Sequence, residues 1–288
     1  MLTIASVAFW RGKFADLDAV LPELEKLATR AGHHIALALL GALLRSRELM
    51  RTGDLRAYLV ESERAVEGPL PMLPANVIRI GVAMTRLYLG QIDEGLDRLA
   101  GAFTPPLMRG LQEGCRFFAN AISDRPDHAR TLFPTLEPLL PARPTRNLAG
   151  AWIGLDGAVT GLAVVGDAAR CAALYPAALV YIDTGLMCLT PVAHASPQIV
   201  AGIAAHAAGL DDRAREHFEI ATQQAKDVPH RLLQPTVQYW YGRMLAEQAD
   251  SADKARGRAM VAAAAADFTK LEMVLHSRLA ERFLRQSF

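Results

Sequence analysis

Residues 209–225 read GLDDRAREHFEIATQQA, a glycine followed by an amphipathic run. Ala214, Phe218 and Ala221 lie five, nine and twelve positions after Gly209. On a helix that begins just after the glycine, these offsets put a small, a large and a second small side chain on one face. Such a face packs closely against the helix before the turn. The run therefore predicts the second helix of a helical hairpin.

The same offsets recur along the whole chain. Six further turn residues begin a comparable run: Gly12, Gly53, Gly90, Asp124, Gly166 and Asp250. Their offset sets are Leu17/Leu21/Leu24, Tyr58/Ser62/Ala65, Gly95/Leu99/Ala102, Ala129/Phe133/Leu136, Cys171/Tyr175/Ala178 and Ala255/Ala259/Ala262. Successive turn residues are 34 to 43 positions apart, which is the period of stacked helical hairpins. We expect an all-α fold, a right-handed superhelix of about seven tetratricopeptide-like hairpins.

One helical-repeat domain is predicted over residues 1–288. Its hairpins are expected at about 1–31, 32–68, 74–104, 106–141, 145–190, 194–228 and 231–267, followed by a capping helix at 271–286. Prolines at offset ten are expected to bend the second helix of three hairpins: Pro22, Pro134 and Pro176. Four glycines of one hairpin predict close approach of two helices: Gly150, Gly154, Gly157 and Gly161. The first helix has one flank uncovered, so we expect a preceding domain or a second chain there.

Composition excludes several classes of protein. Half of the residues are apolar (51%) and only 7% are aromatic, which suits close-packed helices better than a large sheet. The 31 Lys and Arg residues balance 30 Asp and Glu residues, so direct nucleic-acid binding is not expected. Three scattered cysteines fit buried packing in a reducing compartment. No secretory signal or uninterrupted apolar span is present, which predicts a cytoplasmic protein without a membrane partner.

The offset pattern resembles the tetratricopeptide repeat, whose second helix carries Ala, Phe and Ala at these distances after the turn glycine. Residues 209–225, YWYGRMLAEQ at 239–248 and the run from Lys254 to Glu281 resemble the closing repeats of a larger architecture. This is the helical C-terminal region of large ATP-dependent signalling proteins, such as maltose-regulator-like transcription activators and ATPase-linked class III nucleotide cyclases. The resemblance implies a fold and an accessory, signal-transducing role, and it carries over packing residues but no catalytic position.

Motifs for chemistry are missing from the sequence. It contains no phosphate loop of the form G-x-x-x-x-G-K-[ST], no H-E-x-x-H zinc motif and no G-x-S-x-G nucleophile elbow. The histidines are expected at surface or capping positions, and the paired carboxylates on solvated faces. We therefore predict no catalytic residue, no metal and no cofactor.

A stacked array presents a concave surface, lined by the first helix of each hairpin, that suits a peptide or protein partner. The candidate partner-binding residues are Arg79, Arg86, Arg116, Asn120, Trp152, Asp156 and Tyr239. Arginine can bind carboxylates through two nitrogens, and aromatic rings supply contact area. The leading hypothesis is a protein-interaction scaffold, the sensing or oligomerisation region of a larger ATP-dependent regulator. Two alternatives stay open: an all-helical enzyme or small-ligand-binding protein with an internal apolar cavity, and a structural homo-oligomer.

Overall fold

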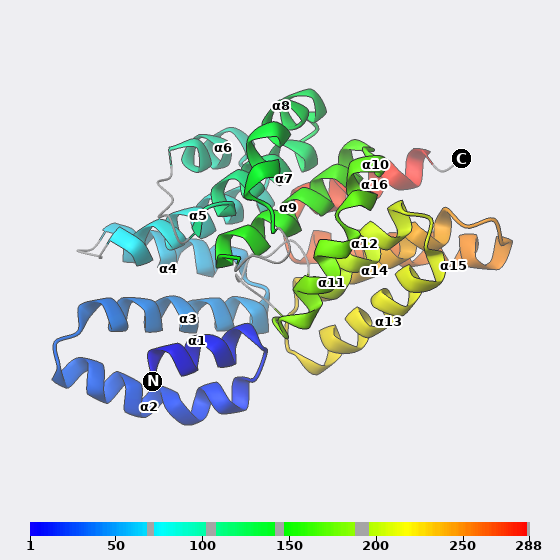
Figure 1. The fold of residues 1–288 in the computed structure, drawn as a ribbon. Coiled ribbons are helices and arrows are strands. Elements are labelled where there is room, and N and C mark those ends of the chain that lie inside the picture. The colour runs from blue at the N-terminus through cyan, green and yellow to red at the C-terminus, as the bar shows by residue number, and fades with distance from the viewer. Residues whose placement is uncertain (68–71, 102–107, 142–146, 188–195, 287–288) are drawn as a thin grey trace.

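The computed structural model describes residues 1–67, 72–101, 108–141, 147–187 and 196–286. In these ranges the chain forms sixteen α-helices and no β-strand, which confirms the all-α prediction (Figure 1). The N-terminal half contains α1 (Leu2–Trp10), α2 (Phe14–Arg30), α3 (His34–Thr52), α4 (Leu55–Glu67), α5 (Met72–Tyr88), α6 (Ile92–Ala100), α7 (Leu111–Ile122) and α8 (Pro126–Leu136). The C-terminal half contains α9 (Ala149–Val165), α10 (Ala168–Ala173), α11 (Tyr175–Asp183), α12 (Pro197–Ala207), α13 (Asp211–Asp227), α14 (Leu233–Ala246), α15 (Ser251–Lys270) and α16 (Val274–Gln286). No helix in the described part of the chain combines the length and the apolar character that crossing a membrane requires.

The turns lie where the sequence predicts them. Six of the seven turn residues have a left-handed backbone, with φ between 62° and 84°: Gly12, Gly53, Gly90, Asp124, Gly166 and Gly209. Glycine adopts this conformation without a steric penalty, and aspartate tolerates it better than most residues. Each of these residues lies between two helices that pack against each other, such as α5 and α6 or α12 and α13. The right-handed superhelix and the number of repeats stay predictions.

The predicted packing faces are buried in most of these helices. Ala214, Phe218 and Ala221 on α13 are at most 1% exposed, and the corresponding residues of α8 are at most 5% exposed. Tyr175 on α11 is only half-buried, and Ala102 lies outside the described residues. The small side chains let the helices of a pair approach, and the large one fills the space between them.

The seventh predicted set is wrong. Ala255, Ala259 and Ala262 on α15 are exposed, whereas Gly257 and Val261 are buried against α14. The reason is that Asp250, the seventh turn residue, has a different role. Its side chain caps α15 by accepting hydrogen bonds from two backbone N–H groups, and its φ of −67° is not left-handed.

The glycine-rich helix α9 is in backbone contact with α7, as predicted. A Cβ atom on Gly157 would lie 2.4 Å from the carbonyl oxygen of Gly114, and one on Gly154 would lie 3.0 Å from that of Gly110. Any larger residue at Gly157 would therefore push the two helices apart. This contact brings the first helices of two neighbouring hairpins close together.

The three prolines at offset ten behave differently. Pro176 lies in the first turn of α11, directly after a break at Leu174 that separates α11 from α10. Pro22 and Pro134 lie inside α2 and α8, which continue through them. Only Pro176 therefore coincides with an interrupted helix.

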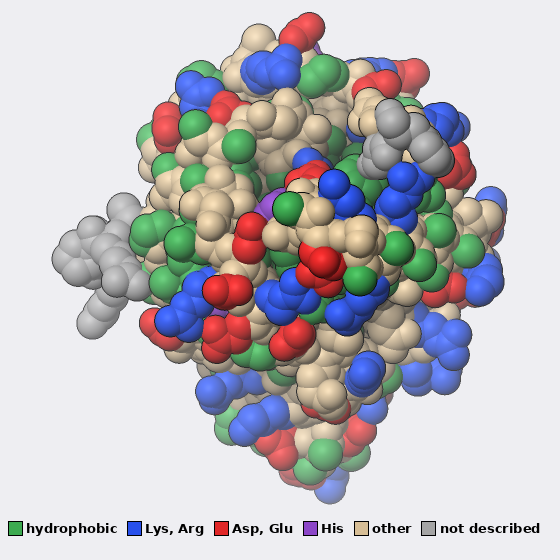
Figure 2. All heavy atoms as spheres, turned by 90° about the vertical axis from the view of Figure 1, so that its right-hand side faces the viewer, with side chains coloured by type: hydrophobic (Ala, Val, Ile, Leu, Met, Phe, Trp, Pro, Cys, Tyr) green, Lys and Arg blue, Asp and Glu red, His purple; other side chains and the backbone are tan. Residues whose placement is uncertain are grey.

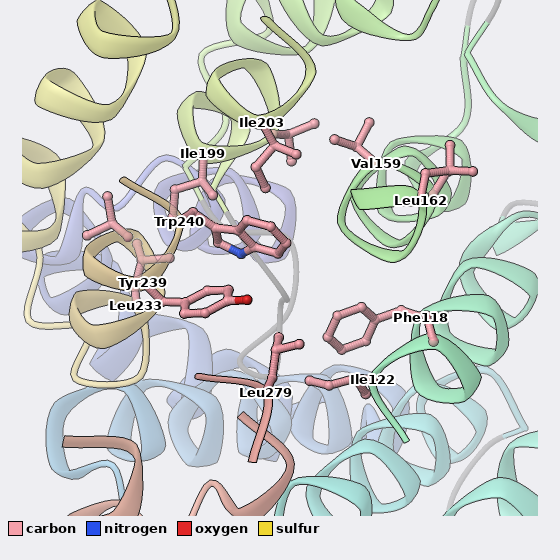
Figure 3. Close-up of a cluster of buried hydrophobic side chains, with 14 of the residues drawn as sticks. Phe118, Ile122, Val159, Leu162, Ile199, Ile203, Leu233, Tyr239, Trp240 and Leu279 are labelled. Carbon is pink, nitrogen blue, oxygen red and sulfur yellow. The ribbon is translucent and has the colours of Figure 1, made fainter. Parts of the chain in front are cut away.

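The inward faces of the first helices of the last four hairpins, α7, α9, α12 and α14, meet in one hydrophobic cluster. Figure 3 shows Phe118 and Ile122 from α7 opposite Tyr239 and Trp240 from α14, with Leu279 of α16 between them. Side chains from α9 and α12 close the cluster from the other side. The surface that the sequence predicts as concave and open is, over these helices, the core of the protein.

The last helix, α16, packs against α5 and α7 as well as against α15, and so brings the C-terminal end of the array against its third and fourth hairpins. His276 on α16 contacts the rings of Tyr88 and Phe118. The turn at Gly53 lies against Leu271, just before α16, and the turn at Gly90 lies against Val274. The chain therefore closes on itself, and α16 does more than cap the final hairpin.

Candidate functional site

Four of the predicted partner-binding residues belong to the interior. Asn120, Trp152, Asp156 and Tyr239 are between 2% and 7% exposed. The amide of Asn120 donates a 2.8 Å hydrogen bond to the carbonyl oxygen of Arg116 on its own helix. Trp152 stacks on Tyr181, with ring centroids 5.2 Å apart. These four side chains thus have packing contacts within the protein, and Trp152 also lines a depression together with Trp10 and Arg11.

Three buried hydroxyl and thiol groups near these residues have raised pKa values. Burial, and then the nearby charge of Asp156, raises the pKa values of the Tyr88 hydroxyl and the Cys115 thiol. Burial raises the pKa of Tyr239 above its ordinary value. These groups therefore stay protonated at neutral pH, and Cys115 is a packing residue as the sequence predicts. Cys188 lies outside the described residues.

Arg79 and Arg86 are brought together in a groove between α4, α5 and α6. Both line a depression of about 560 Å³ whose floor contains Val66 and Val82 and whose rim contains Arg98. Arg79 is exposed, and its guanidinium donates a 3.2 Å hydrogen bond to the side chain of Asn76 on the same helix. We call this depression the α4–α6 groove.

Arg86 is the structural centre of that groove. Its guanidinium pairs with Glu63 of α4 and, at 2.7 Å, with Glu94 of α6, and only 13% of its side chain is exposed. It therefore ties three helices together. Arg98 is exposed but pairs with Glu94 at 3.2 Å, which leaves Arg79 as the more accessible cation. Arg116 is half-buried on α7 and does not line the groove.

A second depression was not predicted from the sequence. It lies between α9, α10, α12, α13 and α14, has a volume of about 320 Å³, and is called here the α12–α14 pocket. Its apolar wall is formed by Cys171, Ile203, Phe218, Trp240 and Met244. Its charged side chains are His206, Arg243 and Glu247. Pockets that bind small molecules commonly combine an apolar wall with a few convergent polar groups.

His206 is held between two carboxylates. Its Nδ1 lies 2.8 Å from Asp211 at the start of α13, and its Nε2 lies 2.8 Å from Glu247 just after α14. Ionised carboxylates only accept hydrogen bonds, so both ring nitrogens must carry a proton and the ring is an imidazolium cation. Burial alone would lower the pKa of His206, but the hydrogen bonds to Glu247 and Asp211 outweigh it and the pKa is raised.

Arg243 completes this network. Its Nε donates to Glu247 at 3.0 Å and its Nη1 to the carbonyl oxygen of Ala163 at 3.2 Å. The guanidinium also lies 5.5 Å from the centre of the Trp240 ring. Burial would raise the pKa of Glu247, but the hydrogen bond from His206 and the charge of Arg243 lower it. The shifts in the pKa values of His206, Arg243 and Glu247 thus all favour the charged forms.

The signal for this pocket in the sequence was weak. Arg243 and Glu247 have the i, i+4 spacing of a helical ion pair, which is common on solvated faces. Nothing local connects them to His206, which lies 41 residues before Glu247.

Elsewhere on the surface, Figure 2 shows Lys, Arg, Asp and Glu side chains interspersed on the face in view, without a broad area of one sign. In the described residues, no group of three or more His, Cys, Asp or Glu side chains is placed to hold a metal ion.

Comparison of the chain with protein-family models, with curated proteins and with solved structures finds no match.

Proposed function

We propose that this chain is a protein-interaction scaffold, a right-handed superhelix of about seven tetratricopeptide-like hairpins completed by α16. The left-handed turn residues and the buried offset sets support this proposal, because both are properties of stacked hairpins. We further propose that it is the sensing or oligomerisation region of a larger ATP-dependent regulator in the cytoplasm. The resemblance of residues 209–281 to the closing repeats of such proteins supports that role.

The α4–α6 groove is the observation that carries the proposal. It offers apolar contact at Val66 and Val82 and the exposed cation of Arg79. Arg98 and Glu67 also line it, and Arg98 pairs with Glu94. Arg86 is already paired with Glu63 and keeps the walls in place. A peptide that combines an apolar side chain with a carboxylate matches this arrangement, because arginine binds a carboxylate through two parallel hydrogen bonds.

A displayed peptide library tests the proposal. Random twelve-residue peptides are selected on the immobilised protein, and the enriched peptides are measured on Arg79→Glu and on the control Arg30→Glu, which changes an exposed arginine on α2. We expect enriched peptides to contain acidic and apolar residues, and to bind Arg79→Glu at least about tenfold more weakly, a difference of about 1.4 kcal/mol. Arg30→Glu should bind as the parent does. Absence of enrichment, or equal binding to both variants, would remove this groove as the partner site.

The second candidate function is small-ligand binding. The α12–α14 pocket favours it, because the pocket has an apolar wall and ionisable groups whose pKa values are shifted.

A further inference from the structure

The charges that line the α12–α14 pocket do not balance. Of the described side chains that line it, His206 and Arg243 are cations and Glu247 is the one anion. Asp211 neutralises His206 from the other side of the ring and is not part of the lining. With Asp211 included the four charges balance, and among the lining side chains alone the cations outnumber the anion by one.

Glu247 is already committed to its neighbours within the protein. One of its oxygens accepts the hydrogen bond from Arg243 and the other lies 2.8 Å from His206 Nε2. Arg243 has five N–H donors, and its contacts with Glu247, the Ala163 carbonyl oxygen and Tyr239 engage three of them. The guanidinium thus keeps two N–H donors for a molecule in the pocket.

The rest of the wall is suited to a hydrocarbon group. Ile203, Phe218, Trp240 and Met244 come from three different helices and surround the same space. The volume of about 320 Å³ is at the small end of the range for ligand sites, which favours a body of one ring or one branched chain. Burial of such a body supplies the main part of the binding free energy, and the charge selects the polar end.

From this geometry we infer that the α12–α14 pocket binds a small organic carboxylate, with an aromatic or branched aliphatic body against Trp240 and Phe218 and its carboxylate at the remaining N–H groups of Arg243. The site is independent of the α4–α6 groove, which is formed by other helices. A bound molecule would contact α9, α10, α12, α13 and α14 at once. It would thereby stabilise the present arrangement of those helices relative to any more open one.

The test uses three probes that share a phenylalkyl body and differ in the charged or polar end: 3-phenylpropionate, the uncharged 3-phenylpropionamide and the cationic 3-phenylpropylamine. Binding is measured by isothermal titration calorimetry at pH 6.5 and followed by fluorescence of the tryptophan residues. We expect saturable binding of the carboxylate, at least about tenfold weaker binding of the amide, and weaker binding still of the amine. Equal binding of the three probes, or no saturable binding of the carboxylate, would overturn the inference.

Two neighbouring alanines on α10 provide matched variants. Ala168 lines the pocket and Ala169 does not, although both are exposed, so leucine at either position leaves the core unchanged. Ala168→Leu should weaken binding of 3-phenylpropionate at least about tenfold by filling the pocket, and Ala169→Leu should leave it unchanged. Equal affinities of the two variants would show that the probe binds elsewhere and would refute the assignment.

Discussion

His276 makes the stability of the protein depend on pH in a defined way. This histidine is 5% exposed on α16, and its ring lies 4.6 Å from that of Tyr88 and 5.2 Å from that of Phe268, measured between centroids. Its Nδ1 has no hydrogen-bond partner among the described residues. Burial lowers its pKa to about 3. The imidazole is therefore neutral in the folded protein and must gain its proton on unfolding at acidic pH.

The sign and the size of the effect follow from the two pKa values. In the unfolded chain the pKa is about 6.5, so the stability contribution is complete above that pH and is lost as the pH falls towards 3. Between pH 7 and pH 5 the loss due to His276 is about 2 kcal/mol, since each pH unit below 6.5 costs about 1.4 kcal/mol. For a chain of this size that corresponds to roughly 4 to 8 °C in the unfolding midpoint.

The variant His276→Phe removes the titrating group and keeps an aromatic ring among Tyr88, Phe118 and Phe268. We expect the free energy of unfolding of this variant to fall by about 2 kcal/mol less than that of the parent between pH 7 and pH 5. Chemical denaturation followed by circular dichroism at the two pH values measures the difference, and the exposed His128→Gln is the control. Parallel pH profiles of the free energy of unfolding for the parent and His276→Phe would show that burial of His276 does not cause the loss of stability at acidic pH.

Three further predictions concern the turns, the glycine contact and the pocket. Gly157→Ala should destabilise the protein by about 1 to 3 kcal/mol through overpacking, whereas Gly101→Ala, where an added Cβ meets its nearest atom at 3.6 Å, should cost less than about 1 kcal/mol in the same denaturation assay. Asp124→Ala should cost about 1 kcal/mol because φ is 62° there and because the ion pair with Arg282 is lost; a midpoint equal to that of the parent would contradict both contributions. His206 has the opposite sign to His276. The pKa of His206 is raised, so its contribution to stability is complete below about pH 6.5 and is lost as the pH rises through the pKa of the folded state. The variant His206→Gln should therefore lose less stability than the parent as the pH rises through this range.

Local chemistry explains why the turns and most packing faces were predictable. A left-handed turn accepts few residue types, so Gly90, Gly166 and Asp124 are visible in the sequence without any knowledge of the fold. The side-chain sizes at offsets five, nine and twelve reflect the contact between the two helices of one hairpin, and that contact is also local in the sequence. The seventh set failed because an aspartate can either occupy a left-handed turn or cap a helix, and spacing alone does not distinguish these roles.

Contacts between distant hairpins were beyond the same reasoning. The Arg243 side chain reaches the Ala163 carbonyl oxygen 80 residues away, and no periodic pattern connects the two. Asn120 and Tyr239 were interpreted as polar or aromatic residues on an exposed concave face. Closure of the array buries both, because the inner faces of α7 and α14 meet across the core and α16 fills the remaining space.

Arrays of helical repeats commonly lengthen or shorten during evolution, since each unit touches only the units beside it. In this protein the turn at Gly53 packs against Leu271 and the turn at Gly90 packs against Val274, so hairpins that are far apart in the sequence share an interface. Inserting or deleting one hairpin between these partners would shift them out of register by the thickness of a helix pair. Growth of such a protein would require copying of the entire array, and natural length variation should be confined to loops and chain ends.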